Sequence, residues 1–481
     1  MTDHIPHPAP AAAPGTATPA ARLDRLPWSR AHTAILLALG AGWLFDSLEV
    51  SLFGSAVGPL GSYFHATVFE QDAILAVWLG GILIGAFAGG HLADRFGRRR
   101  LFVLTLLWYA AFTVLTGASP ALGFVYVLRF LAALGVGAEY AIVNAAIAEL
   151  MPARIRGRAG AVVMNFWPAG GILAGLLAYL LLNTLGLSDA ASWRYLFIGG
   201  GLLALIVLWF RRRIPESPRW LAAHGRTAEA EAIVADLEHA CGIPATTASA
   251  DEPAGKTPAA RPGVFAALGE LLRHHPGRLA LGAALDLAEA FGYYGIFALL
   301  SVVVLPRVHI AHAQVPFFYI LGNLGALVGG LLMALYLDRL GRHRTVAGSY
   351  LLAALGVGLL AWATTTANGT WVTLAFMTAS GFATAAWTSA YPTFTELFPT
   401  HLRAVGVGTS VAVGRIGAIV GTLSLPSLAT AIGATSSYLL VVAFWLVGAA
   451  AIGVFHWRGG IEAATRPLEA LTPPAPLPAR T

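Results

Sequence analysis

Charged residues are scarce in this chain. Asp, Glu, Lys and Arg make up 11% of its 481 residues, whereas soluble globular proteins usually carry about 25%. Hydrophobic residues account for 57%, and the mean hydropathy is +0.70. This composition excludes an ordinary soluble domain and predicts that most of the polypeptide faces lipid or a packed membrane core.

Cysteine and the common catalytic motifs are also lacking. The single cysteine, Cys241, cannot form an intrachain disulfide, and it has no partner in the C-x-x-C spacing of a metal site. The chain contains no P-loop, no zinc-ligand spacing and no G-x-S-x-G element. We therefore expect no metal, no cofactor and no enzymatic activity.

Amide side chains are few where a polar ligand would need them. The only two glutamines, Gln71 and Gln314, fall in predicted loops, and the asparagines well inside apolar runs are Asn144, Asn165 and Asn323. A polyhydroxylated ligand needs many amide and hydroxyl partners. The shortage therefore disfavours a sugar as the ligand.

What the chain does contain is a series of apolar runs of membrane-spanning length. A spanning helix needs about 20 mostly apolar residues. Twelve such runs are found, at 33–60, 73–93, 101–118, 121–150, 158–183, 193–210, 279–305, 315–337, 345–366, 371–396, 403–430 and 436–456. They predict an all-α membrane protein with twelve transmembrane helices.

A polar stretch divides these runs into two sets of six. The predicted organisation is a disordered N-terminal tail at 1–30, a six-helix half at 31–210, a linker at 211–278, a second six-helix half at 279–457 and a C-terminal tail at 458–481. Within the linker, apolar residues at helical spacing predict a surface helix over 227–240. The Ala/Pro/Thr-rich stretch 243–263 is expected to be flexible.

The net charge of +6 reflects arginines that cluster in short loops. They lie in the loops after the second, fourth, eighth and tenth runs, whereas the opposite loops carry few basic residues. Positively charged loops stay on the cytoplasmic side of a membrane. We therefore predict an inner-membrane protein with both termini in the cytoplasm, and no nucleic acid as a partner.

A short basic signature occurs once in each half. It reads D-R-F-G-R from Asp94 and D-R-L-G-R from Asp338, and the two aspartates are 338 − 94 = 244 residues apart. Each copy follows an apolar run. A duplicated turn of this kind at the end of membrane helices indicates a transporter with two related halves.

Two further pairs of motifs repeat at nearly the same offset. Glu149-Leu-Met-Pro precedes Arg156 by seven residues, and Glu396-Leu-Phe-Pro precedes Arg403 by seven, with an offset of 396 − 149 = 247. The third pair is D-x-x-E, from Asp46 and from Asp286, with an offset of 240. These offsets predict two pseudo-symmetric six-helix halves packed around a central cavity.

With these motifs, the chain resembles the major facilitator superfamily over residues 33–470. The resemblance rests on the duplicated D-R-x-G-R turn, on Arg129 followed by Gly135-x-Gly137, and on P-E-S-P-R-W-L from Pro215. It implies a transporter that works by alternating access. The second signature departs from the first, because Ala334 stands where the first copy has Gly90, so the helix contact there is expected to be looser.

Within the superfamily, the chain resembles the sugar porter and metabolite:H⁺ symporter branches. T-E-L-F-P-T-H-L-R-A-V-G-V-G from Thr395 and F-G-Y-Y-G from Phe291 carry this likeness, although the paired glutamines of hexose porters are missing. The first run resembles the D-G-x-D-x-x-x-x-G pattern of aromatic acid:H⁺ symporters. Here it reads Asp46-Ser-Leu-Glu49 and then Gly54, so Ser and Glu replace the pattern's Gly and second Asp.

Acidic residues in the first half are candidates for proton coupling. Asp46 and Glu49 are one helical turn apart and share a face. At 1.5 Å per residue, Asp46 lies about 20 Å from the cytoplasmic edge and Arg129 about 12 Å from the outer edge. These levels nearly coincide within a core of about 30 Å.

We therefore predict an ion pair between Asp46 and Arg129. Its release on protonation would let helices move, a part that the resemblance to proton-coupled sugar porters assigns to these positions; a permanent structural pair is the alternative. Glu139, ten residues after Arg129, either carries the proton or forms a hydrogen bond to a neighbouring helix.

Arg415 lies half way along run 403–430, and its guanidinium remains charged. It binds either a substrate carboxylate or an internal acid, Glu289 or Glu139. Asp286 is expected to be structural, and Glu289 to line the cavity. The other predicted substrate-binding residues are Asn144, Asn165, Trp167, Tyr293, Tyr294, Asn323, Trp387 and Tyr391. Cationic and aromatic groups together suit a small, flat carboxylate, although lipid-facing belts are the alternative for the aromatics.

The motifs at the cytoplasmic ends predict a gate that ties the two halves together through ion pairs. Its residues are Gly90, Asp94, Arg95, Gly97, Arg98, Glu149, Arg156, Asp338, Arg339, Gly341, Arg342, Glu396 and Arg403. The alternative is that these charges are solvated and serve only to orient the loops.

The predicted function is proton-coupled transport of a small organic solute, most simply an organic anion, by a monomer in the lipid bilayer. The alternatives are a sugar or polyol porter and an exporter of drugs or metabolites.

Overall fold

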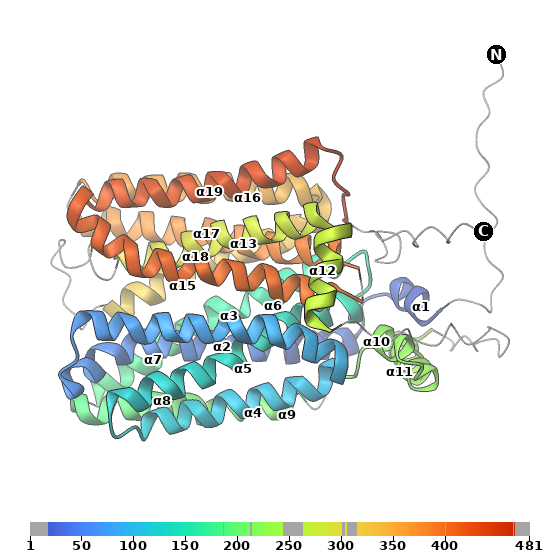
Figure 1. Ribbon diagram of the computed structural model, residues 1–481, viewed down its shortest axis with the longest axis horizontal. Coiled ribbons are helices and arrows are strands. Elements are labelled where there is room, and N and C mark those ends of the chain that lie inside the picture. Colours follow the sequence, from blue (N-terminus) through green and yellow to red (C-terminus); the bar gives the residue numbers. More distant parts are fainter. Residues whose placement is uncertain are drawn as a thin grey trace, which may run out of the picture.

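The computed structural model describes residues 18–185, 187–211, 214–243, 263–300, 304, 315–366, 368–399, 401–464 and 466. Every regular element in this part of the chain is helical, which confirms the predicted all-α fold class. The long helices run along the longest axis of the molecule (Figure 1).

The N-terminal half contains six membrane-length segments among its described residues. The first four are single helices: α2 (Arg30–Phe64), α3 (Val68–Phe96), α4 (Arg98–Gly117) and α5 (Leu122–Leu150). The fifth consists of α6 (Arg156–Met164), α7 (Phe166–Tyr179) and a π-helical turn, η1 (Leu180–Thr184). The sixth consists of α8 (Asp189–Ala204) and α9 (Val207–Arg211).

The C-terminal half has the same number of segments in the described part of the chain. They are α13 (Pro276–Leu299), α15 (Val315–Leu340), α16 (Arg342–Ala363), α17 (Gly369–Leu397), α18 (Arg403–Ile432) and α19 (Ala434–Trp457). Residues 301–303 and 305, at the end of the predicted run 279–305, lie outside the described residues.

The contacts between helices repeat from one half to the other. In the first half α3 packs against α5, α2 against α7, and α4 against α8. The corresponding contacts in the second half are α15 with α17, α13 with α18, and α16 with α19. The halves meet where α3 contacts α18 and where α15 contacts α6 and α7. The internal sequence repeat therefore corresponds to a repeat in packing.

The short helices gather at one end of the bundle, called the linker end below. They are α1 (Pro19–Arg25), α10 (Pro218–Ala223), α11 (Thr227–Ala240) and α12 (Val264–His274) (Figure 1). Helix α11 covers the range in which the apolar spacing predicted a helix. The stretch 243–263 lies outside the described residues except for its first and last residue.

Part of the predicted disordered tail is a helix. Thr18 caps α1 by accepting a hydrogen bond from the Ala21 N–H at 3.3 Å. Arg22 then donates to the two carboxylate oxygens of Glu238 on α11, at 2.9 and 2.7 Å. The bidentate pair holds α1 against the linker. Residues 1–17 and most of the predicted C-terminal tail lie outside the described residues.

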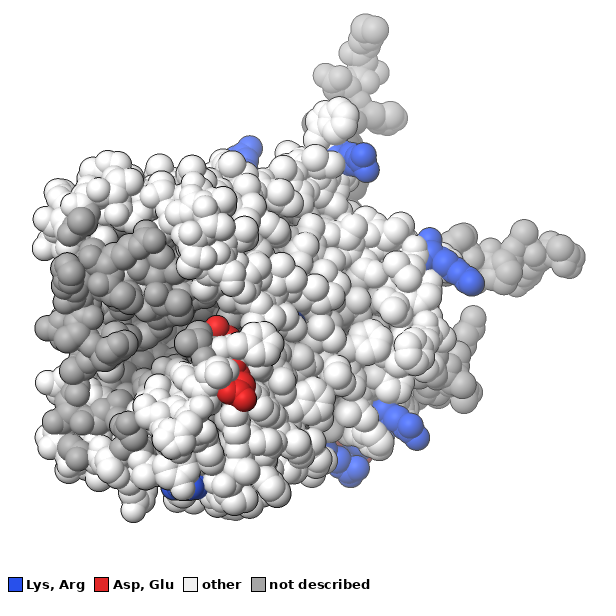
Figure 2. Space-filling view, turned by 60° about the vertical axis from the view of Figure 1, so that its left-hand side comes forward, with Lys and Arg blue, Asp and Glu red and all other residues white. Residues whose placement is uncertain are grey.

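The molecule carries leucines on its surface and arginines in its interior. Leu104, Leu355 and Val328 are more than half exposed, whereas Arg129 and Arg415 are about 1% exposed or less. Most of the visible surface is white in Figure 2, and charged side chains form only small separate patches. This distribution is typical of a protein that is embedded in lipid.

Ten of the described helical segments are long and apolar enough to cross a membrane. The two remaining spans of the described bundle, α13 and α17, are not among these ten. Helix α13 carries Asp286 and Glu289, and α17 carries Trp387, Tyr391 and Glu396. Since polar groups inside a membrane usually serve a function, these helices direct attention to the bundle interior.

Candidate functional site

Arg129 on α5 is buried and pairs with Glu49 on α2. The Thr113 hydroxyl donates to the same carboxylate at 2.9 Å. The predicted pair between Asp46 and Arg129 is therefore not the one formed. The depth estimate placed both acids near the level of Arg129, but three residues turn a helix through about 300°, and it is Glu49 that faces α5.

Glu139, also on α5, pairs with Arg211 at the end of α9. The sequence placed Arg211 at the start of the linker, yet its side chain is 1% exposed and lies inside the bundle. A long arginine side chain can reach back from a helix end in this way. Asp46 lies beside this pair and beside Tyr109, and its oxygens accept no hydrogen bond of normal geometry among the described residues.

Aromatic rings at the centre of the bundle form a chain across both halves. Tyr140 contacts Trp43 with ring centroids 4.6 Å apart, and Trp43 contacts Trp167 at 5.8 Å. Trp167 contacts Trp387 of the other half at 5.4 Å, and Trp387 contacts Tyr293 at 5.1 Å. These five rings are buried, so the structure places Trp167, Tyr293 and Trp387 in the interior and not at a lipid-facing belt.

Arg415 is buried beside this aromatic chain. It donates to the Tyr391 hydroxyl at 3.4 Å, and its guanidinium lies over the rings of Tyr140 and Tyr294 at 5.0 and 5.7 Å. Among the described residues, no carboxylate lies within ion-pair distance of Arg415. Its Nε and Nη1 atoms have no hydrogen-bond partner within the described part of the chain.

The internal acids proposed as partners of Arg415 are engaged elsewhere. Glu139 pairs with Arg211, and Glu289 accepts a hydrogen bond from Tyr350 at 3.4 Å. Asp286 is fully buried on α13 and faces α18. The guanidinium is thus surrounded by tyrosines and not by a bonded carboxylate.

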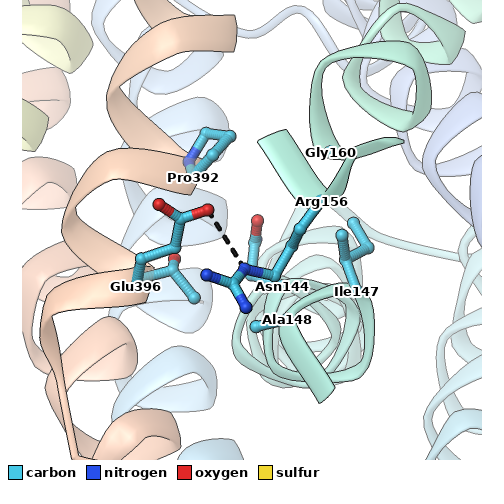
Figure 3. A pocket seen from close by; sticks show the side chains of 8 residues that line it. Asn144, Ile147, Ala148, Arg156, Gly160, Pro392 and Glu396 are labelled. Atoms are coloured by element: carbon cyan, nitrogen blue, oxygen red, sulfur yellow. Dashed lines mark hydrogen bonds and ion pairs between the residues drawn. The ribbon is translucent and has the colours of Figure 1, made fainter. Parts of the chain in front are cut away.

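The three intramembrane asparagines lie at the contact between the halves. Each donates to the carbonyl four residues earlier in its own helix, at 2.8 to 2.9 Å. Asn165 packs against Gly330 of α15, and Asn323 packs against Gly171 of α7. Asn144 lines a small cavity near the linker end (Figure 3). Among the described residues, none of the three asparagines forms a hydrogen bond with Arg415.

The duplicated motifs build two equivalent ion-pair clusters at the linker end. In the first half, Arg98 pairs with Asp94 and with Glu149, each at 2.8 Å. In the second half, Arg342 pairs with Asp338 at 2.8 Å and with Glu396 at 2.9 Å. We call these two clusters the linker-end network.

Arginines from each half complete the cluster of the other half. Arg156 pairs with Glu396 at 3.1 Å, as Figure 3 shows, and Arg403 lies 3.8 Å from Glu149. The backbone N–H of Arg158 donates to Asp338 at 2.7 Å. These contacts join the halves, so the linker end of the bundle is closed.

Two glycines shape the turns of the network. Gly97 and Gly341 have φ angles of 90° and 83°, which glycine adopts without a Cβ clash. At the first turn, a carboxylate from after the sixth span caps α4, since Glu216 accepts from the N–H groups of Arg98 and Arg99 at 2.9 and 3.2 Å.

The second turn is capped in the same way from after the twelfth span. Glu462 accepts from the N–H groups of Arg342 and His343 at 2.9 and 3.2 Å. Burial by itself would raise the pKa of Glu462, but hydrogen bonds from the N–H groups of Arg342, Ala464 and His343 outweigh it and lower that pKa. The two caps are 462 − 216 = 246 residues apart, so they belong to the same internal repeat.

The departure at Ala334 also has a structural counterpart. A Cβ on Gly90 would come within 2.3 Å of the Ala404 carbonyl on α18, so the helices approach closely there. Ala334 instead packs with Ala161 and Leu337. Arg95 and Arg339, predicted as gate residues, are exposed and form no ion pair with any described residue.

Comparison with known proteins agrees with this architecture. A family model described as Major Facilitator Superfamily matches residues 39–422 and 287–473. The chain belongs to the Major Facilitator Superfamily. It is therefore a membrane transporter of small solutes and not an enzyme, as predicted.

Relatives within the superfamily cover nearly the whole chain. The Niacin transporter NiaP of Acinetobacter baylyi is 29% identical over 438 residues, which are 90% of this chain and 95% of the relative. The Putative metabolite transport protein YyaJ of Bacillus subtilis is 27% identical, with 88% and 92% covered. The structure of the proton:xylose symporter XylE bound to 6-bromo-6-deoxy-D-glucose aligns with a TM-score of 0.75 at 19% identity, covering 92% of this chain and 98% of that chain.

Several residues of this superfamily member were not identified from the sequence. Trp43 and Tyr140 are next to the acids that were, since Trp43 is three residues before Asp46 and Tyr140 follows Glu139. Glu216 lies within the P-E-S-P-R-W-L motif, and the 246-residue offset would have led from it to Glu462.

Proposed function

We propose that this transporter carries a small organic anion, most simply a flat carboxylate, together with protons. It does so by alternating access in the cytoplasmic (inner) membrane, as a monomer. One observation carries the proposal: Arg415 is buried in the bundle and has no carboxylate within ion-pair distance among the described residues.

A buried guanidinium without an anionic partner is costly, because the charge cannot be removed by deprotonation. Tyr140, Tyr294 and Tyr391 stabilise it through ring faces and one hydroxyl. A substrate carboxylate would supply the missing negative charge and could accept hydrogen bonds from Nε and Nη1 of Arg415. Arg415 is therefore the proposed anion-binding residue.

The aromatic rings beside Arg415 suit a planar ligand. Trp167 and Trp387 come from different halves and touch each other, so a flat molecule between them would contact both halves at once. A relative is named as a niacin transporter, and niacin is a flat aromatic carboxylic acid. This name supports the proposed substrate class.

The likeness to a xylose symporter bears on the fold alone at 19% identity. The amide groups that a sugar would need are turned to the carbonyls of their own helices. We therefore keep the sugar or polyol porter as an outcome of the test and not as a second proposal.

For coupling, the pair between Glu49 and Arg129 is the proposed proton-dependent element. Protonation of Glu49 would remove one charge of a buried pair and weaken the contact between α2 and α5. Such a change alters the balance between conformations only if the pair differs between them. The proposal places this site in the N-terminal half, away from Arg415.

The orientation follows from the positions of the arginines. The linker-end network and the neighbouring loops hold the buried Arg98, Arg156, Arg342 and Arg403 together with several exposed arginines. Since positively charged ends face the cytoplasm, we propose that the linker end and both termini are cytoplasmic.

The test is counterflow in proteoliposomes containing the full chain, with a panel of aromatic monocarboxylates, aliphatic acids, sugars and polyols. We expect an aromatic monocarboxylate to be exchanged. Arg415→Ala should weaken its binding by about 1.5–3 kcal/mol, the range for a charged hydrogen bond. Arg415→Lys should restore part of the affinity, because lysine keeps the charge but lacks the planar fork.

Arg339→Ala is the matched control, since it removes an exposed arginine that forms no ion pair among the described residues. It should leave binding unchanged. Exchange of a sugar and of no carboxylate would overturn the anion proposal. Unchanged carboxylate binding in folded Arg415→Ala would assign Arg415 a structural role.

A further inference from the structure

Asp286 differs from the other buried acids of the bundle. It is fully buried on α13, yet neither carboxylate oxygen has a hydrogen-bond partner of normal geometry among the described residues. Glu49, Glu139 and Glu289 each accept a hydrogen bond from another side chain. Asp46 also lacks one, but Asp46 lies with Arg211 and Glu139 in the other half.

The Asp286 carboxylate rests against the backbone of the residue that precedes Arg415. A Cβ on Gly414 would lie 1.6 Å from Asp286 Oδ2, so only glycine leaves room for the carboxylate there. Helices α13 and α18 pack closely along this contact. Asp286 and Arg415 therefore occupy one buried site although they form no direct ion pair in this conformation.

Tyr391 on α17 lies between the two charges. Its hydroxyl accepts a hydrogen bond from Arg415 at 3.4 Å and also faces Asp286. A hydroxyl can accept from a guanidinium and donate to a carboxylate at the same time. Through the Tyr391 hydroxyl, a change in the protonation of Asp286 therefore alters the hydrogen bonding of Arg415.

The other groups around Asp286 come from several helices. Glu289 and Tyr294 lie on α13 itself, Tyr350 of α16 donates to the Leu285 carbonyl at 3.0 Å, and Tyr140 of α5 faces the site across the halves. On α19, Tyr438 reaches the Ile296 carbonyl further along α13, and the charged residues of α12 lie near the linker end. Arg415 is the cation of this set.

Charge balance decides which combinations of Asp286, Arg415 and a bound anion are stable. Arg415 with ionised Asp286 is neutral, and so is Arg415 with protonated Asp286 and a bound carboxylate. Arg415 with both ionised Asp286 and a bound carboxylate would carry a net negative charge. Arg415 with protonated Asp286 and no bound anion would carry a net positive charge. Either net charge is costly in the low-dielectric interior of the bundle.

From this balance we propose that Asp286 is a protonation site coupled directly to anion binding: Arg415 binds the substrate carboxylate only when Asp286 is neutral. The inference rests on the proposed function and adds a second proton site, in the C-terminal half, to the pair of Glu49 and Arg129.

The step exchanges one proton and one anion. Asp286 takes a proton from water on the side to which the site is open and becomes a neutral acid. The substrate carboxylate then occupies the anionic position at Arg415. After the site opens to the other side, the anion leaves, Asp286 returns its proton to water, and the ionised Asp286 again neutralises Arg415. Proton and anion thus move in the same direction.

Binding of nicotinate to the purified full chain tests this coupling. Between about pH 6 and 9 an aromatic carboxylate stays ionised, so any pH dependence comes from the protein. If the competent state requires a protonated acid, the Kd of the wild type should rise about tenfold per pH unit above the titration midpoint. In Asp286→Asn, which resembles the protonated form, the Kd should stay low and flat.

One variant serves as the comparison. Asp72→Asn, at an acid on α3 outside both sites, should keep the wild-type slope. If Asp286→Asn does not fold, Asp286→Glu should retain the slope with a displaced midpoint.

The outcomes separate the two proposals. If no carboxylate binds to the wild type at any pH, the proposed function fails. If nicotinate binds but Asp286→Asn keeps the wild-type slope, or if the midpoint of Asp286→Glu is unmoved, the role of Asp286 is overturned and the proposed function stands. Loss of binding in folded Asp286→Asn, with normal binding in Asp286→Glu, also overturns it.

Discussion

Asp46 and Glu49 are three residues apart on α2, but they contact different helices. Glu49 pairs with Arg129 and accepts from Thr113, whereas Asp46 lies beside Tyr109 near the pair of Glu139 and Arg211. Removing one member of a buried ion pair commonly costs about 3–5 kcal/mol, because the other charge remains buried. Which of the two acids faces Arg129 therefore determines whether the buried guanidinium has an anionic partner.

At this scale we predict that Glu49→Gln reduces accumulation driven by a pH gradient but allows counterflow, since the proton site proposed at Asp286 remains. Glutamine keeps the shape and an acceptor oxygen, so the bundle can still exchange substrate, but it cannot bind and release a proton. The measurement is uptake into proteoliposomes with and without an imposed pH gradient.

Asp46→Asn is the comparison variant, since it neutralises the neighbouring acid that does not contact Arg129. Intact proton-driven accumulation by Glu49→Gln, together with its loss in Asp46→Asn, would show that Asp46 carries the proton and that the contact with Arg129 is only structural.

The helices that follow the two D-R-x-G-R turns begin in the same way. Helices α4 and α16 each start after a glycine with a positive φ. Because glycine has no side chain, the N-cap residue itself cannot accept a hydrogen bond from the first N–H groups of the helix. Glu216 and Glu462 supply the missing acceptor from segments that follow the last span of each half. A negative charge at a helix N-terminus is also favoured by the helix dipole.

We predict that Glu216→Ala and Glu462→Ala each destabilise the first turn of the helix they cap, by about 0.5–2 kcal/mol. Hydrogen exchange at residues 98–100 and 342–344 should become faster, and the unfolding temperature in detergent should fall. Because the pKa of Glu462 is lowered in the folded protein, the stabilisation by its ionised carboxylate is fully present at pH values above the ordinary pKa of glutamate. It is lost as the pH falls through the lowered pKa of the folded state.

Glu229→Ala provides the control for these caps, since Glu229 is an exposed acid on α11 that pairs, among the described residues, only with Arg226 just before that helix. It should change neither exchange rate. Equal exchange at residues 98–100 in Glu216→Ala and in the parent would contradict the capping role.

The whole molecule is closed at the linker end by contacts that exist only when the halves are together. Arg156 reaches Glu396, Arg403 approaches Glu149, and the Arg158 N–H donates to Asp338. Arg156 and Arg403 are each buried beside an acid of the other half, so separation of the halves would expose these charges to water. These contacts favour the conformation that is closed at this end over one that is open there.

We predict that Arg156→Ala combined with Arg403→Ala shifts the population toward conformations that are open at the linker end. A loss of about 1.4 kcal/mol changes the ratio of two states tenfold. Spin labels at Arg99 and Arg344, which are exposed at the starts of α4 and α16, should show longer distances by double electron–electron resonance. Cys241→Ser removes the only native cysteine.

A matched pair of changes tests the role of charge by itself. Arg95→Ala with Arg339→Ala removes the same number of arginines from the same end of the bundle, but these side chains form no ion pair among the described residues. Their distance distribution should equal that of the parent. A shift of equal size in both double variants would mean that net charge, and not the contacts between halves, controls the linker end.

The sequence alone determined the class of the molecule and its division into halves. An apolar run of spanning length can be recognised from the local sequence. Since unpaired peptide groups are costly in lipid, a run of about 20 apolar residues spans the membrane as an α-helix. The repeat of Asp94 at Asp338, and of Glu149 at Glu396, also lies in the sequence as an offset. The ion-pair clusters of Arg98 and Arg342 repeat at the same offset in the structure, because a motif that repeats in the sequence packs in the same way in each half.

Only the tertiary structure decided which charges meet. Depth along a helix can be counted from the sequence, but the rotation of the helix about its axis depends on packing with its neighbours, and this selected Glu49 over Asp46 for Arg129. Arg211 turned inward to Glu139 because a long side chain can reach beyond its own position. Asp286 came to lie beside Arg415 because Gly414 leaves room for a carboxylate between two helices that are far apart in the sequence.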